Sequence, residues 1–190
     1  MFIQTENTPN PSTLKFIPEK NILKKGNFEF KSKSEAKISP LAMKLFENED
    51  VKNVFFGIDF ITITKSEAID WELIKPDILS KIMNFFSSGL PVINEGDISE
   101  NDDSSKKEVY NKKDLKIVEH IKELLEEKIR PAVAQDGGDI RFVKFEDYIV
   151  FLELRGSCAG CPSSTLTLKS GIENMLKYYI PEIKSVEAVN

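Results

Sequence analysis

The stretch LRGSCAGCPSS, residues 154–164, places Cys158 and Cys161 three positions apart, and the 190-residue chain has no other cysteine. A run in which every second residue is apolar ends at Leu154, and this alternation predicts a strand with at least one buried face. Pro162 suits the first position of a helix. The stretch therefore predicts a strand, a loop that holds both thiols, and a helix, in that order.

The residues around this stretch predict a small domain in the order helix, strand, strand, helix, strand. The first helix carries apolar residues at three- and four-residue steps and ends before Pro131. Two adjacent glycines in QDGGDIRF precede the strands. The second helix has an apolar face formed by Leu168, Ile172, Met175, Leu176 and Tyr179, and Pro181 stops it. The expected ranges are Leu115–Ile129, Ile140–Phe145, Tyr148–Leu154, a helix from Pro162, and Ile183–Val189.

The first half of the chain mixes strands and helices but contains no His or Cys. FIQTE and TLKFIP predict short strands around the rigid turn NTPNPS, and Val51–Lys65 predicts a hairpin. Ser39 and Pro40 mark the start of one helix. A second helix is expected over Trp71–Phe86, with Leu73, Ile74, Ile78, Ile82 and Phe85 on its apolar face. We interpret the many Phe side chains as core.

The middle of the chain separates two domains. No aromatic residue lies between Phe86 and Tyr110, and the stretch NEGDISENDDSS, Asn94–Ser105, has five acidic residues and no basic one. Such a stretch buries too little apolar surface to offset the entropy lost on ordering. The sequence thus predicts an α+β protein in which two small α/β domains, residues 1–90 and 113–190, are joined by an acidic flexible linker over residues 91–112.

Composition excludes some classes of function. The 26 Lys and Arg residues against 31 Asp and Glu give a net charge of −5, which argues against a general binder of nucleic acid or anionic membranes. No basic amino-terminal region followed by an apolar stretch is present, and no apolar run is long enough to suggest a membrane span. We expect a soluble, unexported protein in a reducing, cytosol-like compartment.

The thiol pair is compatible with several kinds of chemistry. A loop that enters a helix favours thiolate over thiol, and small Ala159 and Gly160 leave room for a bulky ligand. A thioredoxin-like dithiol, a zinc site shared by two chains, and an iron-sulfur cluster shared by two chains all remain open, as does a pair of buried structural cysteines. His120 is interpreted as an ordinary surface residue, because no cysteine lies within one helical turn of it.

Two longer segments carry a resemblance to a known family. RGSCAGCPSSTLTLKSGIENMLK, preceded by PAVAQDGGDIRF, resembles the carboxy-terminal domain of NifU-family iron-sulfur cluster carriers. TPNPSTLKFIP and VFFGIDFITITK resemble the Nfu amino-terminal domain. Together the two resemblances cover nearly the whole chain outside the expected linker.

The resemblance implies a carrier and not an enzyme. In that family a 4Fe-4S cluster bridges two subunits, and Cys158 and Cys161 match its ligands. The cluster is expected to arrive from an upstream assembly scaffold and to pass to recipient apoproteins, which the amino-terminal domain helps to recruit. The chain lacks the cysteines of the scaffold and ferredoxin-like domains of full-length nitrogen-fixation NifU proteins. We expect it in the cytoplasm, or in the mitochondrial matrix if it is a processed eukaryotic form.

Overall fold

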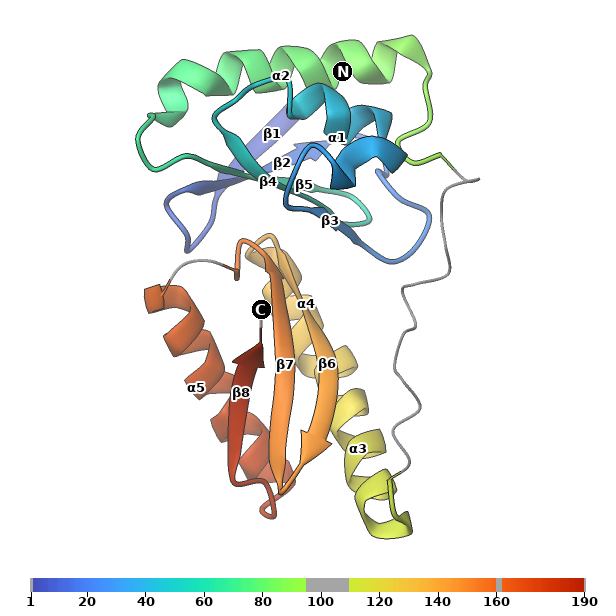
Figure 1. Cartoon of the computed structure of the whole chain (residues 1–190), viewed down its shortest axis with the longest axis vertical. Coiled ribbons are helices and arrows are strands. Elements are labelled where there is room, and N and C mark those ends of the chain that lie inside the picture. The colour runs from blue at the N-terminus through green and yellow to red at the C-terminus, as the bar shows by residue number, and fades with distance from the viewer. Residues whose placement is uncertain (1, 95–109, 160–161, 190) are drawn as a thin grey trace. The chain divides into compact units, whose positions relative to one another are not determined.

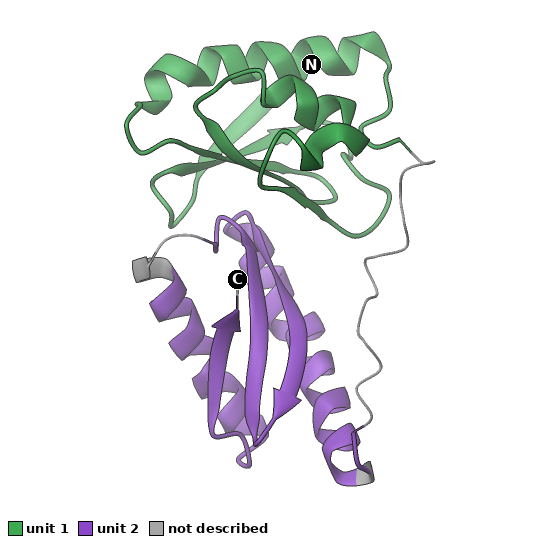
Figure 2. Ribbon diagram, viewed as in Figure 1, with its two compact units in different colours: residues 1–102 green, residues 103–190 purple. Residues whose placement is uncertain are grey.

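The computed structural model describes residues 2–94, 110–159 and 162–189. The chain divides into two compact units, residues 1–102 (unit 1) and 103–190 (unit 2), shown in Figure 2. Both units combine helices with a sheet, so the predicted α+β class with two domains is confirmed. The linker predicted over residues 91–112 falls mainly on 95–109, which lie outside the described residues.

Unit 1 is built on a five-stranded sheet in the order β1-β2-β5-β4-β3, in which all neighbours are antiparallel. The NTPNPS turn joins β1 and β2, and its hydrogen bonds are local: the Thr8 hydroxyl donates to the carbonyl oxygens of Asn10 and Thr13, at 2.9 and 3.0 Å. Sequence analysis missed β3, which has only three residues. The strands are Ile3–Asn7 (β1), Thr13–Pro18 (β2), Phe28–Phe30 (β3), Val51–Phe56 (β4) and Ile61–Lys65 (β5).

The helices α1 and α2 cover one face of this sheet (Figure 1). Ser39 caps α1 as predicted, because its hydroxyl accepts a hydrogen bond from the Ala42 backbone N–H at 3.1 Å. The predicted apolar face of α2 was wrong at Leu73, which is 68% exposed, since position 73 is turned about 100° from the buried stripe. That stripe is Ile74, Ile78, Ile82 and Phe85. The helical segments are Glu35–Ile38 (η1), Pro40–Leu45 (α1) and Trp71–Ser88 (α2).

The first residues of the predicted linker contact unit 1. The Ser39 hydroxyl donates to the Val92 carbonyl at 2.6 Å, and the Asn94 N–H donates to the Ile38 carbonyl at 2.9 Å. Ile93 is buried in the core that α1 and the sheet share. The packed part of unit 1 therefore includes residues 92–94, which the sequence assigned to the linker.

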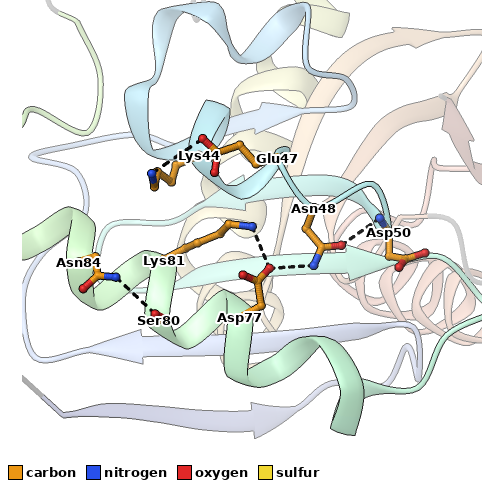
Figure 3. Close-up of polar contacts among 8 residues, drawn as sticks. All are labelled: Lys44, Glu47, Asn48, Asp50, Asp77, Ser80, Lys81 and Asn84. Carbon is orange, nitrogen blue, oxygen red and sulfur yellow. Dashed lines mark hydrogen bonds and ion pairs between the residues drawn. The ribbon is translucent and has the colours of Figure 1, made fainter.

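Polar side chains tie α2 to the loop after α1 (Figure 3). Asp77 on α2 accepts hydrogen bonds from Lys81 and from the Asn48 side-chain amide, both at 2.8 Å. The Asn48 side-chain oxygen in turn accepts from the Asp50 N–H at 3.0 Å. The Lys81 ammonium and these hydrogen bonds hold the pKa of Asp77 below its usual value. These contacts fix the approach of β4 to the helix.

Unit 2 is built on a three-stranded sheet in the order β6-β7-β8 (Figure 1). β6 and β7 form an antiparallel hairpin whose turn residues Asp147 and Tyr148 both have positive φ. β8 pairs in parallel with β7, so the chain crosses over between them through α5. The strands are Gly138–Glu146 (β6), Ile149–Gly156 (β7) and Ser185–Val189 (β8), and α5 is Pro162–Tyr179.

The first helical stretch of unit 2 passes Pro131, where it was predicted to end. It consists of α3 (Lys112–Leu124), a π-helical turn η4 (Leu125–Ile129) and α4 (Arg130–Gln135). Pro131 stands in the first turn of α4, where its missing N–H needs no partner within that segment. The π turn therefore ends just before the proline, and a new helical segment, α4, begins there. Arg130, the first residue of α4, contacts the sheet at Ile140.

Side chains of the helices, and of Tyr110 just before α3, contact backbone groups of both edge strands of this sheet. Arg130 donates to the Ile140 carbonyl at 3.2 Å, and the Phe145 N–H donates to the Tyr110 hydroxyl at 3.2 Å, both on β6. On β8, the Val186 N–H donates to the Glu173 carboxylate at 3.0 Å. Such partners occupy backbone groups of the edge strands that could otherwise pair with strands of other chains. None of the helices in the described residues combines the length and apolar character that a membrane span requires.

Candidate functional site

Cys158 lies two residues beyond the end of β7 and is packed into the core of unit 2. Its side chain is 6% exposed, and it belongs to the same cluster as Ile140, Leu154 and Ile172. Cys161 lies outside the described residues; in the sequence it directly precedes Pro162, where α5 begins. The predicted order of strand, thiol loop and helix is confirmed.

The turn Gly137–Gly138 packs directly against Cys158. Gly138 pairs with Gly156 at the end of the β6–β7 ladder, and the Ser157 N–H donates to the Gly137 carbonyl at 3.2 Å. A Cβ atom at Gly138 would lie 2.5 Å from the Cys158 sulfur and 2.8 Å from the Arg155 carbonyl oxygen. Only glycine leaves room for the sulfur at this position, which gives the DGGD motif a local structural reason.

Hydrogen bonds hold the backbone on both sides of the thiol. The Ser157 hydroxyl donates to the Asp136 carbonyl at 2.5 Å and lies 3.8 Å from the Cys158 sulfur. On the other side, the Thr165 hydroxyl donates to the Cys158 carbonyl at 3.2 Å. The thiol is therefore anchored to the β6 turn and to α5 at once.

The environment of Cys158 favours the neutral thiol. Its pKa is raised to about 11: burial is the largest cause, the Ser157 hydrogen bond lowers the pKa by less, and the carboxylates of Asp136 and Asp139 raise it. The expectation that the loop before the helix favours thiolate is therefore wrong for Cys158, because loss of hydration outweighs other effects. The alternative of a buried structural cysteine describes the placement of this residue.

An ion pair between a buried carboxylate and a partly exposed arginine lies beside the site and was missed by sequence reasoning. Asp139 is 9% exposed, and its carboxylate lies 3.1 Å from the Arg130 Nε. Burial raises the pKa of Asp139 despite the opposing charges of Arg130 and Arg155. The only signal in the sequence was an acidic residue at the start of an apolar strand.

Other titratable residues are not drawn into the site. His120 is exposed on α3, as the sequence predicted. Across residues 2–94, 110–159 and 162–189, no three side chains among His, Cys, Asp and Glu are grouped so that they could hold a metal ion. The two cysteines of the chain are thus the residues to consider for binding of a soft metal.

Comparison with protein families matches both units. Residues 3–89 match the model described as "Scaffold protein Nfu/NifU N terminal", and residues 121–187 match the model described as "NifU-like domain". The second match contains the DGGD turn and both cysteines. The chain belongs to the Nfu family.

Curated members of the Nfu family align with the whole chain. The protein named "NFU1 iron-sulfur cluster scaffold homolog, mitochondrial" from Homo sapiens is 52% identical over 190 residues, which are 100% of this chain and 72% of the relative. Proteins of the same name from Drosophila willistoni and Drosophila sechellia are 50% and 53% identical, and the chain spans 64% and 65% of their length.

Among solved structures, a NifU-like protein from Saccharomyces cerevisiae has a TM-score of 0.46 at 28% identity, covering 50% of this chain and 86% of that one. A protein from Staphylococcus epidermidis has a TM-score of 0.34 at 27% identity, covering 47% and 100%.

Proposed function

We propose that the protein takes part in iron-sulfur cluster assembly as a carrier of a 4Fe-4S cluster, which two copies hold through Cys158 and Cys161 and pass to recipient apoproteins. The observation that carries the proposal is that the chain places its entire thiol supply in the loop between β7 and α5 of the unit that matches the NifU-like domain. The name "iron-sulfur cluster scaffold" of the relatives supports the same cargo.

The donor set fits this cargo when two chains combine. A 4Fe-4S cluster takes four thiolates, and one chain has two cysteines. A symmetric dimer supplies the remaining pair from the same residues of the second copy. Thiolate ligands also suit zinc, so the identity of the bound metal separates the cluster carrier from a zinc module.

The buried state of Cys158 suits a carrier that must give up its cargo. Binding requires the thiol to leave the core and lose its proton, and both steps oppose cluster affinity because the folded environment raises its pKa. On transfer, each iron–sulfur bond to the carrier is replaced by a bond to a recipient thiolate. Each proton that a recipient thiol loses is balanced by one that a carrier cysteine, Cys158 or Cys161, regains, and no electron is transferred.

The same features disfavour a dithiol redox protein. A reactive dithiol needs an accessible thiolate of lowered pKa, whereas Cys158 is buried and its pKa is raised. Transfer without turnover also means that the protein acts as a carrier and not as an enzyme.

We propose that unit 1 recruits donor scaffolds or recipients, because it contains no His or Cys and so neither a thiolate nor an imidazole ligand. The names of the relatives include the word mitochondrial. The compartment we propose is the mitochondrial matrix, or the cytoplasm where the chain is not imported.

The experiment is anaerobic reconstitution with iron and sulfide, followed by metal and sulfide analysis. The parent protein should form a brown, dimeric cluster species, and either Cys158→Ser or Cys161→Ser should abolish stable binding. Thr167→Ser, on the exposed side of α5, is the matched control and should bind as the parent does. Full retention of iron and sulfide by Cys158→Ser, or binding of zinc in their place, would contradict the proposal.

A further inference from the structure

A single arginine fixes the start of β6 at two adjacent residues. The Arg130 Nε lies 3.1 Å from the Asp139 carboxylate and 3.2 Å from the Ile140 carbonyl oxygen. Its other end is held by Glu126, one helical turn earlier, at 2.5 Å. The π turn η4 and α4 thus connect rigidly to the strand at the point where it leaves the DGGD turn.

This connection reaches the thiol through one residue. Asp139 follows Gly138, and Gly138 packs so closely on Cys158 that a Cβ atom there would lie 2.5 Å from the sulfur. Across the ladder, Asp139 is opposite Arg155 on β7, which leads to the loop that carries Cys158. A shift of the start of β6 therefore displaces the surface that covers the thiol.

A contribution to the free energy of folding does not explain the buried Asp139 carboxylate. The Arg130 side chain is 36% exposed, so solvent screens its attraction to Asp139, and burial removes hydration from the carboxylate. Such a pair often contributes little net stability. Here burial raises the pKa of Asp139, so the charged form is disfavoured in the folded protein. A carboxyl of raised pKa favours folding most at low pH, and this contribution falls as the pH rises through its folded pKa. Near neutral pH the charge on Asp139 therefore opposes folding. Its role is better sought in the local order of the turn that precedes β6.

We infer that Asp139, held by Arg130, is a positioning residue that keeps the Gly137–Gly138 turn closed over Cys158 and thereby sets how readily the thiol leaves the core. The inference rests on the proposed function for its consequence, which is control of cluster retention and release. The claim that Asp139 keeps the turn closed concerns the cluster-free protein, and it does not depend on which cargo the protein binds.

Hydrogen exchange in the full-length cluster-free protein tests the structural part. The Ser157 N–H, which donates to the Gly137 carbonyl, reports opening of the turn, and the Leu152 N–H in the middle of β7 reports opening of the sheet. Asp139→Asn should raise exchange at Ser157 at least about tenfold and leave exchange at Leu152 within about threefold. Glu187→Gln is the matched control, since it breaks another pair between helix and strand, with Lys169 at 2.7 Å, and should change neither.

Variants of the partner test whether the pair acts as a unit. Arg130→Met should raise exchange at Ser157 at least as much as Asp139→Asn, since it also removes the donor to the Ile140 carbonyl. The double variant should not exceed Arg130→Met, because that variant has already lost the pair with Asp139. Arg130→Lys keeps the charge but loses the planar donor group that also reaches Ile140, so its exchange should be intermediate. If Asp139→Asn fails to fold, the Arg130→Lys result decides the question by the same ratio of Ser157 to Leu152 exchange.

Cluster loss to an iron chelator tests the consequence. The reconstituted Asp139→Asn and Arg130→Met proteins should lose their clusters several-fold more slowly than the parent and Glu187→Gln, because a loosened turn makes the return of the Cys158 thiol to the core less favourable. An equal rise in exchange at Ser157 and Leu152, or no rise at either, would overturn the positioning role. Unchanged cluster lifetimes despite faster Ser157 exchange would overturn its control of release. Failure of the parent to bind a cluster would count against the proposed function and leave the exchange test of positioning intact.

Discussion

Units 1 and 2 both pack helices on a sheet, but their polar side chains are arranged differently. In unit 1 the network of Asp77, Lys81 and Asn48 joins exposed segments, and Asp77 remains 44% exposed. In unit 2 a carboxylate that is 9% exposed stands beside a close-packed glycine turn and a buried thiol. Buried polar groups are costly unless they are satisfied, so they indicate where a protein is organised for more than stability. This contrast supports the proposal that unit 2 carries the chemistry and unit 1 the recognition.

The largest expected effect concerns the reactivity of Cys158. In cluster-free Cys161→Ser protein, a pKa of about 11 instead of 9.0 leaves about 100-fold less thiolate near neutral pH. Alkylation of folded Cys158 by iodoacetamide should therefore be slower than in the denatured chain by at least this factor, and its pH profile should have a midpoint near 11. Because the pKa is raised by folding, the thiol favours the folded state below pH 9 and progressively less as the pH rises to about 11.

A cysteine placed in unit 1 is the control for this measurement. Ser87→Cys on the exposed side of α2, in a protein whose two native cysteines are changed to Ser, should react like an ordinary thiol. Equal alkylation rates for this thiol and for Cys158 would contradict the claim that burial in unit 2 suppresses the reactivity of Cys158.

Two glycine variants within unit 2 separate the site from its supporting helix. Gly138→Ala places a Cβ atom 2.5 Å from the Cys158 sulfur and should lower the free energy of unfolding of unit 2 by about 1–3 kcal/mol. Gly171→Ala lies inside α5 with nothing within 4 Å, and should raise it by about 0.5–1 kcal/mol. Urea unfolding monitored by circular dichroism measures both. Equal effects of the two variants would contradict the close packing of Gly138 on the thiol.

Removal of unit 1 tests the division of labour. A fragment from Tyr110 onward keeps the hydrogen bond between its hydroxyl and the Phe145 N–H, and should bind as much cluster per dimer as the full chain. Activation of an apo four-iron enzyme should be several-fold slower with the fragment at low carrier concentration, because a tethered recruiting domain raises local concentration. The gap should close as the concentration rises. Loss of cluster uptake by the fragment would show that unit 1 helps to build the site.

The smallest expected effect lies in the exposed network of unit 1. Asp77→Asn should lower the free energy of unfolding near neutral pH by about 0.5 kcal/mol, the usual contribution of an exposed ion pair, and leave cluster content unchanged. Since the pKa of Asp77 is lowered below 3.8, its contribution is present above that pH and is lost as the pH falls further. Urea titrations of parent and variant should therefore converge in strong acid. A persistent difference there would assign the effect to packing.

Local patterns predicted much of the fold. Alternation located β7, helical spacing located α5, and Ser39 with Pro40 marked the start of α1. These predictions succeeded because each depends on a few neighbouring residues. The end of the first helix of unit 2 was misplaced because a π turn, which has no such local pattern, accommodates Pro131.

The site was less predictable than the fold. The resemblance identified Cys158 and Cys161 as candidate ligands, and their assignment remains a prediction. The burial of Cys158 depends on the contact of β6 with the loop after β7, which is distant in the sequence. The pairing of Asp139 with Arg130 depends on how α4 packs against β6, which no local pattern indicates. Tertiary packing reversed the local expectation of a thiolate at the helix entrance.

The central claim is that two copies share one cluster through four thiolates. Native mass spectrometry of the anaerobically reconstituted protein tests it most directly, because it weighs the intact assembly. The account predicts the mass of two chains with one 4Fe-4S cluster, a return toward single chains after chelation, and no such species for Cys158→Ser. A cluster on a single chain, or a dimer of Cys158→Ser that retains the cluster, would contradict it.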